Sequence, residues 1–297
     1  MGSKKSNRIA ALFILATTLL MLSRVASATR LDSRLAQAVY TPIPVHVFGL
    51  IPRAYLPIVL NSTALATLPP GSPLPSDADC AARVKSTPEN KAINAIYNTI
   101  MGNQRLGSDI FSGSDPRAYT DIAARVTGRF TGATDMILQW AACKWGIDPD
   151  IARAQAAVES WWRQNAKGDW GADPDRCPPG HGLGVDDPEY HSNECPESWG
   201  LYQIRYPYQV SAWPGMAEST AFNADTTFAI WRACFEGYEG WLNRVDKGED
   251  YKPGDAWGCV GRWYAGRWHT SAAEAYISKV KSYFHNRVWE QPGFQEP

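Results

Sequence analysis

The acid Glu159 stands inside an apolar and aromatic run, "AAVESWWRQNAKGDW", at residues 156–170. A carboxyl group screened from water by Val158, Trp161 and Trp162 has its charged form disfavoured, so its pKa rises and it keeps its proton near neutral pH. Such a group can protonate the oxygen of a glycosidic bond. The alternative is an exposed Glu159 that pairs with Arg163 one turn on, an i,i+4 contact worth only ~0.3–0.5 kcal/mol.

Two later segments carry side chains suited to a polar ligand. In "SWGLYQIRYP", residues 198–207, the amide of Gln203 offers both a donor and an acceptor. In "GCVGRWYAGRW", residues 258–268, Tyr264 lies between glycines and aromatics, and its phenol could reach a carboxylate. The chain has 13 tryptophans, all between Trp140 and Trp289. These indoles suit either a tryptophan-rich core or a surface that stacks on sugar rings.

The elements that must position these side chains have the spacing of amphipathic helices. The expected helices cover residues 87–102, 134–146, 147–162, 222–245 and 271–289. The first opens at Thr87 and Pro88 and carries four apolar residues at helical spacing: Ile93, Ile96, Tyr97 and Ile100. The third begins at the N-cap Asp148 and places Glu159 near its C-terminal end, beside a loop. Residues 167–198 have no periodicity. We therefore expect one mainly α-helical domain with a long loop.

The N-terminal residues 1–28 have the basic, apolar and small-residue regions of a secretory signal peptide. The apolar run is shorter than the ~20 residues that span a bilayer, although an uncleaved anchor is the alternative. Residues 29–78 are rich in proline and predict a linker, which leaves 79–292 as the catalytic domain. A formal net charge of -1 gives no reason to expect nucleic acid or an anionic membrane as partner. We expect a secreted monomer without stable membrane insertion.

Six cysteines in an exported chain are expected to pair as disulfides. Cys177 and Cys195 bound a loop that also contains His181 and His191, so a four-ligand zinc clasp is the alternative there. We favour the disulfide, with the histidines exposed and no metal. The next preferred pairing is Cys234 with Cys259, leaving Cys80 with Cys143, but six cysteines allow 15 connectivities.

Four segments in order resemble the motif set of lytic transglycosylases and goose-type lysozymes. They are "KWGIDPDIARAQAAVESWWRQNAKGDWGA", "SWGLYQI", "WGCVGRWYAG" and "AYISKVKSYF", and they lie within roughly residues 140–285, about half of the chain. The resemblance implies a lysozyme-like fold that cuts the β-1,4 bond between N-acetylmuramic acid and N-acetylglucosamine in peptidoglycan. It implies no cofactor.

By position, Glu159 resembles the acid of the family, Ser160 the residue after it and Gln203 the glutamine of the sugar cleft. The segment "WYAG" departs from the family, because it puts Trp263 where the family has tyrosine and Tyr264 where it has asparagine. We expect Tyr264 to hydrogen-bond the acid, because it alone has a hydroxyl. The remaining residues expected to bind substrate are Trp162, Tyr202 and Trp263.

The product depends on whether a second carboxylate exists. Inverting hydrolysis needs a base ~6.5–9.5 Å from the acid, and a retaining nucleophile lies ~5–5.5 Å away. Without one, the sugar's own C6 hydroxyl closes on C1 and the product is a 1,6-anhydro sugar, which we favour. Asp169 and Asp173 are the first candidates for a second carboxylate, although loop acids are usually solvated. Chitinase-type cleavage and a non-catalytic glycan-binding module are the alternative functions.

Overall fold

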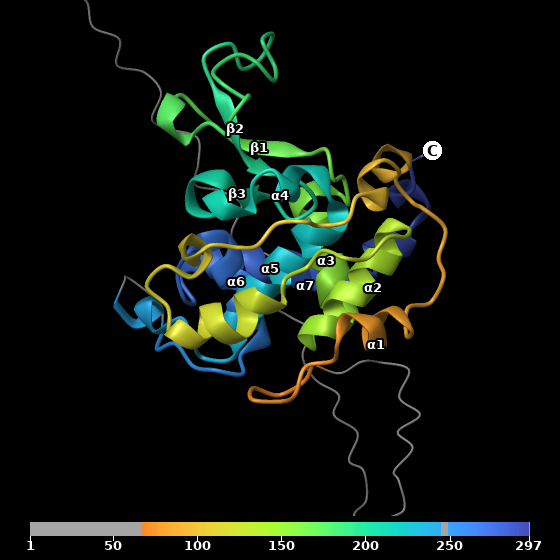
Figure 1. Ribbon diagram of the computed structural model, residues 1–297, viewed down its shortest axis with the longest axis vertical. Helices are drawn as coiled ribbons and strands as arrows, with labels where there is room; N and C mark the ends of the chain where they lie inside the picture. The colour runs from red at the N-terminus through yellow and green to blue at the C-terminus, as the bar shows by residue number, and fades with distance from the viewer. Residues whose placement is uncertain (1–66, 245–248, 297) are drawn as a thin grey trace, which may run out of the picture. The chain divides into compact units, whose positions relative to one another are not determined.

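The computed structural model describes residues 67–244 and 249–296, which are mainly α-helical with one small sheet (Figure 1). The predicted signal peptide and most of the predicted linker lie outside the described residues. No helix in the described ranges is both long and apolar enough to cross a membrane.

The helices begin and end where local capping signals place them. Asp148 caps the helix that carries Glu159 by accepting a hydrogen bond from the Asp150 amide at 2.8 Å, with Pro149 in the first turn. The preceding helix ends at Gly146, whose φ of 62° favours glycine. The helices are α1 (Asp77–Ala81), α2 (Thr134–Trp145), α3 (Pro149–Ser160), α4 (Gly215–Glu218), α5 (Thr220–Phe235), α6 (Ala256–Ala265) and α7 (Ser271–Asn286). The predictions for α2, α3 and α7 are confirmed apart from their ends. The helix predicted at residues 222–245 is confirmed only as far as Phe235, and a separate 3-10 turn follows at Gly240–Arg244.

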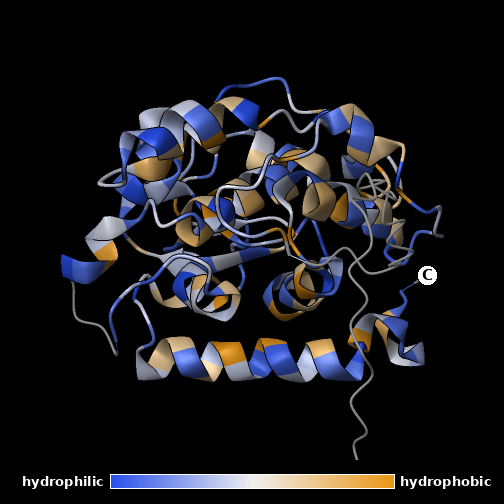
Figure 2. Ribbon diagram, turned by 90° about the horizontal axis from the view of Figure 1, so that it is seen from below, coloured by the Kyte–Doolittle hydropathy of each residue, from blue (hydrophilic) through white to orange (hydrophobic). Residues whose placement is uncertain are grey.

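Helix α5 forms the centre of the core, and every one of its residues is buried. It packs against α2, α4 and α6, while α3 packs against α2 and α7 (Figure 1). The polar residues of α5, such as Asn223 and Arg232, are buried together with its apolar ones, whereas α3, α6 and α7 each bury only part of their residues. Hydrophobic and hydrophilic residues alternate along the helices (Figure 2). The buried centre is therefore α5, with α3 packed on its neighbour α2 and α7 packed on its neighbour α6.

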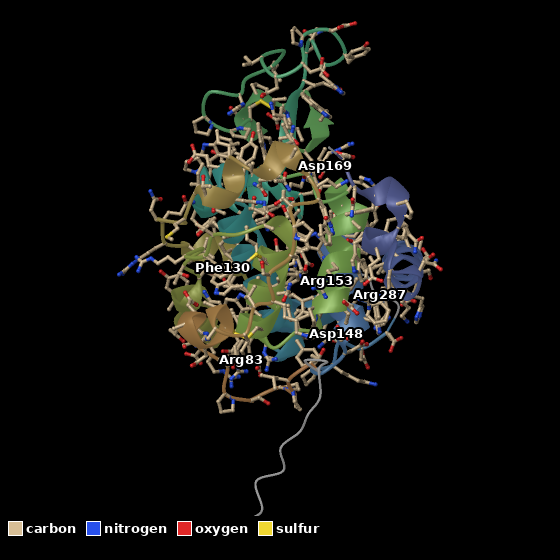
Figure 3. The ribbon with its side chains drawn as sticks, turned by 90° about the vertical axis from the view of Figure 1, so that its right-hand side faces the viewer. Arg83, Phe130, Asp148, Arg153, Asp169 and Arg287 are labelled. Carbon is tan, nitrogen blue, oxygen red and sulfur yellow. A yellow bond between two sulfur atoms is a disulfide. The ribbon has the colours of Figure 1, made fainter. Side chains whose placement is uncertain are left out.

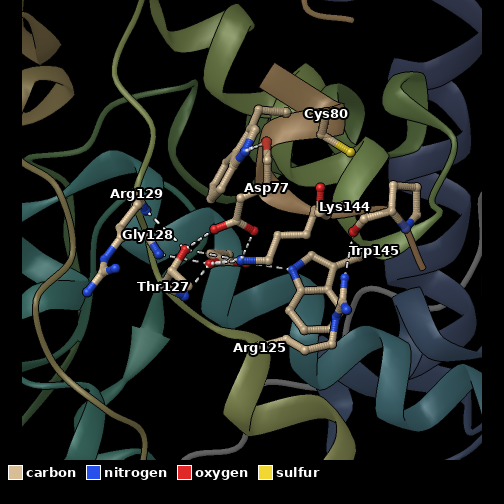
Figure 4. A network of polar contacts seen from close by, with 12 residues as sticks. Asp77, Cys80, Arg125, Thr127, Gly128, Arg129, Lys144 and Trp145 are labelled. Carbon is tan, nitrogen blue, oxygen red and sulfur yellow. Dashed lines mark hydrogen bonds and ion pairs between the residues drawn. The ribbon is translucent and has the colours of Figure 1, made fainter. Parts of the chain in front are cut away.

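A buried ion pair joins three of these helices (Figure 4). Lys144 of α2 contacts Asp225 of α5 at 2.7 Å and Asp77 of α1 at 2.8 Å. Asp225 also accepts hydrogen bonds from the Trp145 indole and the Thr127 amide. The network can stay buried because its charges are paired and the Asp225 oxygens accept further hydrogen bonds. Removing one partner would leave an unpaired buried charge and lower the stability of the fold.

The sheet is antiparallel in the order β1 (Lys167–Gly171), β2 (Cys195–Trp199), β3 (Ile204–Arg205). Residues 172–194 join β1 to β2 and project from the helices (Figures 1 and 3). We call them the hairpin loop, and the Cys177–Cys195 bond at its base the loop disulfide. All three expected disulfides are present, including Cys80–Cys143 and Cys234–Cys259. They are compatible with export.

The zinc clasp considered for this loop is not formed, because both of its cysteines are in the loop disulfide. The two histidines are also not fully exposed as predicted. His181 and Lys167 contact the carboxylate of Asp186, which is buried, and His191 stacks on Trp170 with ring centres 3.8 Å apart. Within the ranges described, no cluster of His, Cys, Asp or Glu could hold a metal ion.

The prediction of a helix at residues 87–102 was wrong. Only two short 3-10 turns form there, at Ala92–Asn94 and Tyr97–Thr99. The apolar stripe faces outward, with Ile96 67% exposed, while Asn94 and Asn98 are buried. Both asparagine amides donate to the hydroxyl of Thr134, at 2.9 and 3.1 Å. The tertiary hydrogen bonds of the two asparagine amides therefore outweighed the local hydrophobic pattern.

The folded unit is longer than the predicted 79–292 at both ends. Arg232 of α5 donates to the carbonyls of Leu68 and Pro69 at 2.8 and 2.9 Å, so the end of the predicted linker packs on the domain. At the other end Phe294 is buried, and Glu296 contacts Lys91 at 3.3 Å.

Candidate active site

Glu159 lies in the last turn of α3, where the chain leaves the helix sharply. Trp161 and Trp162 have φ values of 57° and 63°, a left-handed conformation that ends the helix. The Ser160 hydroxyl donates to the Leu201 carbonyl at 2.7 Å. This bond ties the end of α3 to the turn between β2 and β3, so the acid is held between the helices and the sheet.

Glu159 lines a cleft with a volume of ≈ 960 Å³. This volume is near the upper end of the range found for ligand-binding pockets. Residues from α3, α6, the sheet and the loops around them line the cleft. They are Asp109, Ile110, Ser112, Ser114, Glu159, Asp169, Gln203, Arg205, Tyr208, Gln209, Glu239, Trp241, Arg262, Trp263, Tyr264, Ala265, Gly266 and Arg267.

Burial is the main influence on Glu159 and raises its pKa from 4.5 to about 7. The nearby negative charge of Asp169 also raises it. Hydrogen bonds from Tyr276 and Trp263 and the positive charge of Lys279 lower it, but they do not offset the burial. A carboxyl group with this pKa is protonated in a large fraction of molecules at neutral pH, so it can act as an acid and, after losing its proton, as a base.

The hydroxyl that donates to Glu159 belongs to Tyr276 of α7, not to Tyr264 as predicted. The ring of Tyr264 instead stacks on that of Tyr276, with centres 4.9 Å apart and planes at 3°. Tyr264 lines the cleft and is 63% exposed, so its outer face is available to a ligand. Tyr276 belongs to the segment "AYISKVKSYF", for which the sequence predicted only a helix. A tyrosine at a helical position in that segment gave no signal that it contacts Glu159.

Gln203 and Trp263 line the cleft as expected. Gln203 has a φ of 53°, and its side chain donates to the carbonyls of Gly200 and Ala166 at 2.9 and 3.2 Å. A Cβ at Gly168 would lie 2.4 Å from the Gln203 side-chain oxygen, so a larger residue at this position would displace the end of the Gln203 side chain.

Several predicted substrate-binding residues lie elsewhere. Trp162 and Tyr202 are fully buried core residues, and their polar atoms donate to backbone carbonyls of α3 at 2.9 and 2.8 Å. Ser160 supports the backbone, as described above. The alternative pairing of Glu159 with Arg163 is not formed, because Arg163 binds Glu296.

The two candidates for a second carboxylate differ in position. Asp173 does not line the cleft, and it caps a short turn through the Asp175 amide. Asp169 lines the cleft at the foot of the projecting hairpin loop (Figure 3). It accepts a hydrogen bond from the Ser198 hydroxyl, and Arg205 lies 3.8 Å away. Asp169 is thus the acid that the fold brings near Glu159.

The chain has no match among protein-family models, curated proteins or solved structures. Its chemistry must therefore be judged from its own residues. In the cleft, a carboxyl group with a raised pKa is held by a tyrosine hydroxyl, beside a second carboxylate and exposed aromatic rings. This arrangement can donate a proton to a ligand and take one back.

Proposed function

We propose that the protein is an exported enzyme that cleaves peptidoglycan at the β-1,4 bond between N-acetylmuramic acid and N-acetylglucosamine. One observation carries this proposal, namely the Glu159 carboxyl group with a pKa of about 7 at the wall of an open, aromatic cleft. The order of motifs in the sequence supplies the substrate class, and a lysozyme-like arrangement of the helices is part of the proposal. The secreted location rests on the signal-like N-terminus and agrees with three disulfides.

In the proposed reaction Glu159 protonates the glycosidic oxygen while the bond from that oxygen to C1 breaks. Tyr276 keeps the carboxyl group oriented, and Gln203 with Trp263 seats the sugar. The C6 hydroxyl of the muramic residue then attacks C1 and gives its proton to the Glu159 carboxylate. The product is a 1,6-anhydro sugar, and the acid is regenerated for the next cycle.

The position of Asp169 favours hydrolysis as a second candidate function. A carboxylate in the same cleft could activate a water molecule, which would attack C1 and leave a reducing end. Mass spectrometry of the released muropeptides separates the two reactions, because hydrolytic products are heavier by one water. Asp169→Asn should abolish hydrolysis but leave most of a transglycosylation reaction.

Clearing of a peptidoglycan gel by the full chain tests the proposal. We expect Glu159→Gln to lower activity by two or more orders of magnitude, in line with the ~10²- to 10⁴-fold of general acid catalysis. Glu189→Gln in the hairpin loop is the matched control, because Glu189 is exposed and outside the cleft. Near-normal clearing by folded Glu159→Gln would refute the assignment. If the unmodified chain binds peptidoglycan without clearing it, the protein is a glycan-binding module. If it clears chitin but not peptidoglycan, it is a chitinase.

A further inference from the structure

Two aromatic rings in the cleft are each held by arginine side chains that are anchored on a buried glutamate. The rings are Tyr208, which follows β3, and Trp241, which follows α5, and both line the cleft that contains Glu159. Neither was singled out in the sequence. The glutamates that anchor them have no part in the acid chemistry described above.

At the first ring, Glu197 accepts hydrogen bonds from both Arg176 and Arg205. The distances are 2.6 and 2.7 Å to Arg176, and 2.9 and 2.7 Å to Arg205. The Glu197 side chain is only 5% exposed. The two guanidinium groups lie 5.5 and 5.3 Å from the centre of the Tyr208 ring, within the range of cation–π contacts. Tyr208 is nevertheless 55% exposed.

At the second ring, Glu239 accepts a two-pronged contact from Arg262 at 2.6 and 2.5 Å. The Glu239 side chain is 1% exposed. The Arg262 guanidinium lies 5.4 Å from the centre of the Trp241 ring, which is half-buried. A bidentate arginine has a defined orientation, and its cation–π contact favours one orientation of the ring beside it.

We infer that Tyr208 and Trp241 are two preorganised stacking platforms for the uncharged sugar rings of an N-acetylated oligosaccharide. This inference rests on the proposed function, because it assigns substrate-binding residues to the same cleft. The C–H face of a pyranose ring fits the negative face of an aromatic ring, and a ring already fixed in place loses little entropy on binding.

The charges in the cleft favour a neutral ligand over other ring-shaped ones. Arg262 is neutralised by Glu239, and Arg205 contacts both Glu197 and Asp169. Arg267 also lines the cleft, but Asp109 and Asp169 lie there too and would repel phosphate groups, so the lining is not a basic surface. Nucleotide bases stack on similar rings, but their phosphates require a basic surface. Both rings line the same cleft, so the ligand that we infer is an oligosaccharide with one sugar ring on each platform.

The test is calorimetric binding of the hexamer of β-1,4-linked N-acetylglucosamine to the full chain carrying Glu159→Gln, which prevents turnover. Tyr208→Ala and Trp241→Ala should each weaken binding about tenfold, the size expected for losing one aromatic contact. Tyr208→Phe and Trp241→Phe keep a ring and should retain most of the affinity.

Matched controls come from exposed or half-buried aromatics outside the cleft. Tyr190→Ala removes a tyrosine that is 76% exposed in the hairpin loop, and Trp257→Ala removes an indole that contacts Lys281 at 5.0 Å. Both should bind like the parent. Thermal unfolding of every variant separates lost folding from lost binding.

Unchanged affinity in folded Tyr208→Ala and Trp241→Ala, or no hexamer binding by the parent, would overturn the inference. Clearing of peptidoglycan by the chain with an intact Glu159 is measured separately. If that chain clears peptidoglycan but the platform variants bind normally, only the inference fails. If it clears no glycan but binds the hexamer through both platforms, only the proposed enzymatic function fails.

Discussion

Replacing Glu159 with glutamine should stabilise the protein at alkaline pH. The glutamine is nearly the same size as the protonated acid, but it never has to carry a charge in the cleft wall. In the native protein the pKa of Glu159 is about 7, against its ordinary value of 4.5. Since the folded state holds the proton more tightly, the native protein loses stability as pH rises from 4.5, and the loss is complete above pH 7.

The difference between these two pKa values corresponds to about 3 kcal/mol, from 1.36 kcal/mol for each pKa unit. Solvent in the cleft screens part of this energy, so about 3 kcal/mol is the upper value. Urea unfolding at pH 4.5 and pH 8 measures it for both chains. The stability of Glu159→Gln relative to the native chain should increase by 1 to 3 kcal/mol, as an order-of-magnitude estimate, between the two pH values. Glu189→Gln should show no such change. An equal difference between Glu159→Gln and the native chain at both pH values would refute the raised pKa.

Three further changes test the site and the fold. Tyr276→Phe removes a hydrogen bond that lowers the pKa of Glu159, so the alkaline limb of the pH–activity profile should move to higher pH; an unmoved or lowered limb would contradict this role. Lys144→Met leaves the Asp225 carboxylate buried without its cation and should cost ~3–5 kcal/mol in urea unfolding, so a loss below ~1 kcal/mol would show that the network matters little. Replacing both cysteines of the loop disulfide with serine should cost ~3 kcal/mol on the entropic model for a closed loop of 18 residues; an unchanged unfolding midpoint would show that the loop is held by its other contacts.

The local elements of the fold were readable from the sequence because their signals are local. Asp148 with Pro149 marks the start of α3, and Gly146 marks the end of α2, since capping depends only on neighbouring residues. The expected compartment predicted that the six cysteines pair, but it left 15 connectivities open, and the preferred one is the one that the structure contains.

The residues around Glu159 left open whether it is a screened acid or an exposed partner of Arg163, and the resemblance of the ordered motifs favoured the acid. Glu159 lies in an apolar run near a predicted helix end, and such surroundings raise a carboxyl pKa wherever they remain packed. Its partner could not be selected. Tyr276 is 117 residues away, and it meets Glu159 only because α7 packs against α3. Tyr264 lies within the "WYAG" motif and was therefore predicted instead. One face of its ring stacks on Tyr276, and Tyr264 also lines the cleft.

Residue type and spacing therefore determined which groups could do chemistry, and tertiary packing decided which of them meet. Trp162 and Trp241 have the same side chain, yet the first fills the core and the second lines the cleft. Asp169 and Asp173 are four residues apart, and only Asp169 faces the cleft. The physical reason is that burial, pKa and ring orientation depend on all of the atoms surrounding a side chain, most of which come from distant parts of the chain.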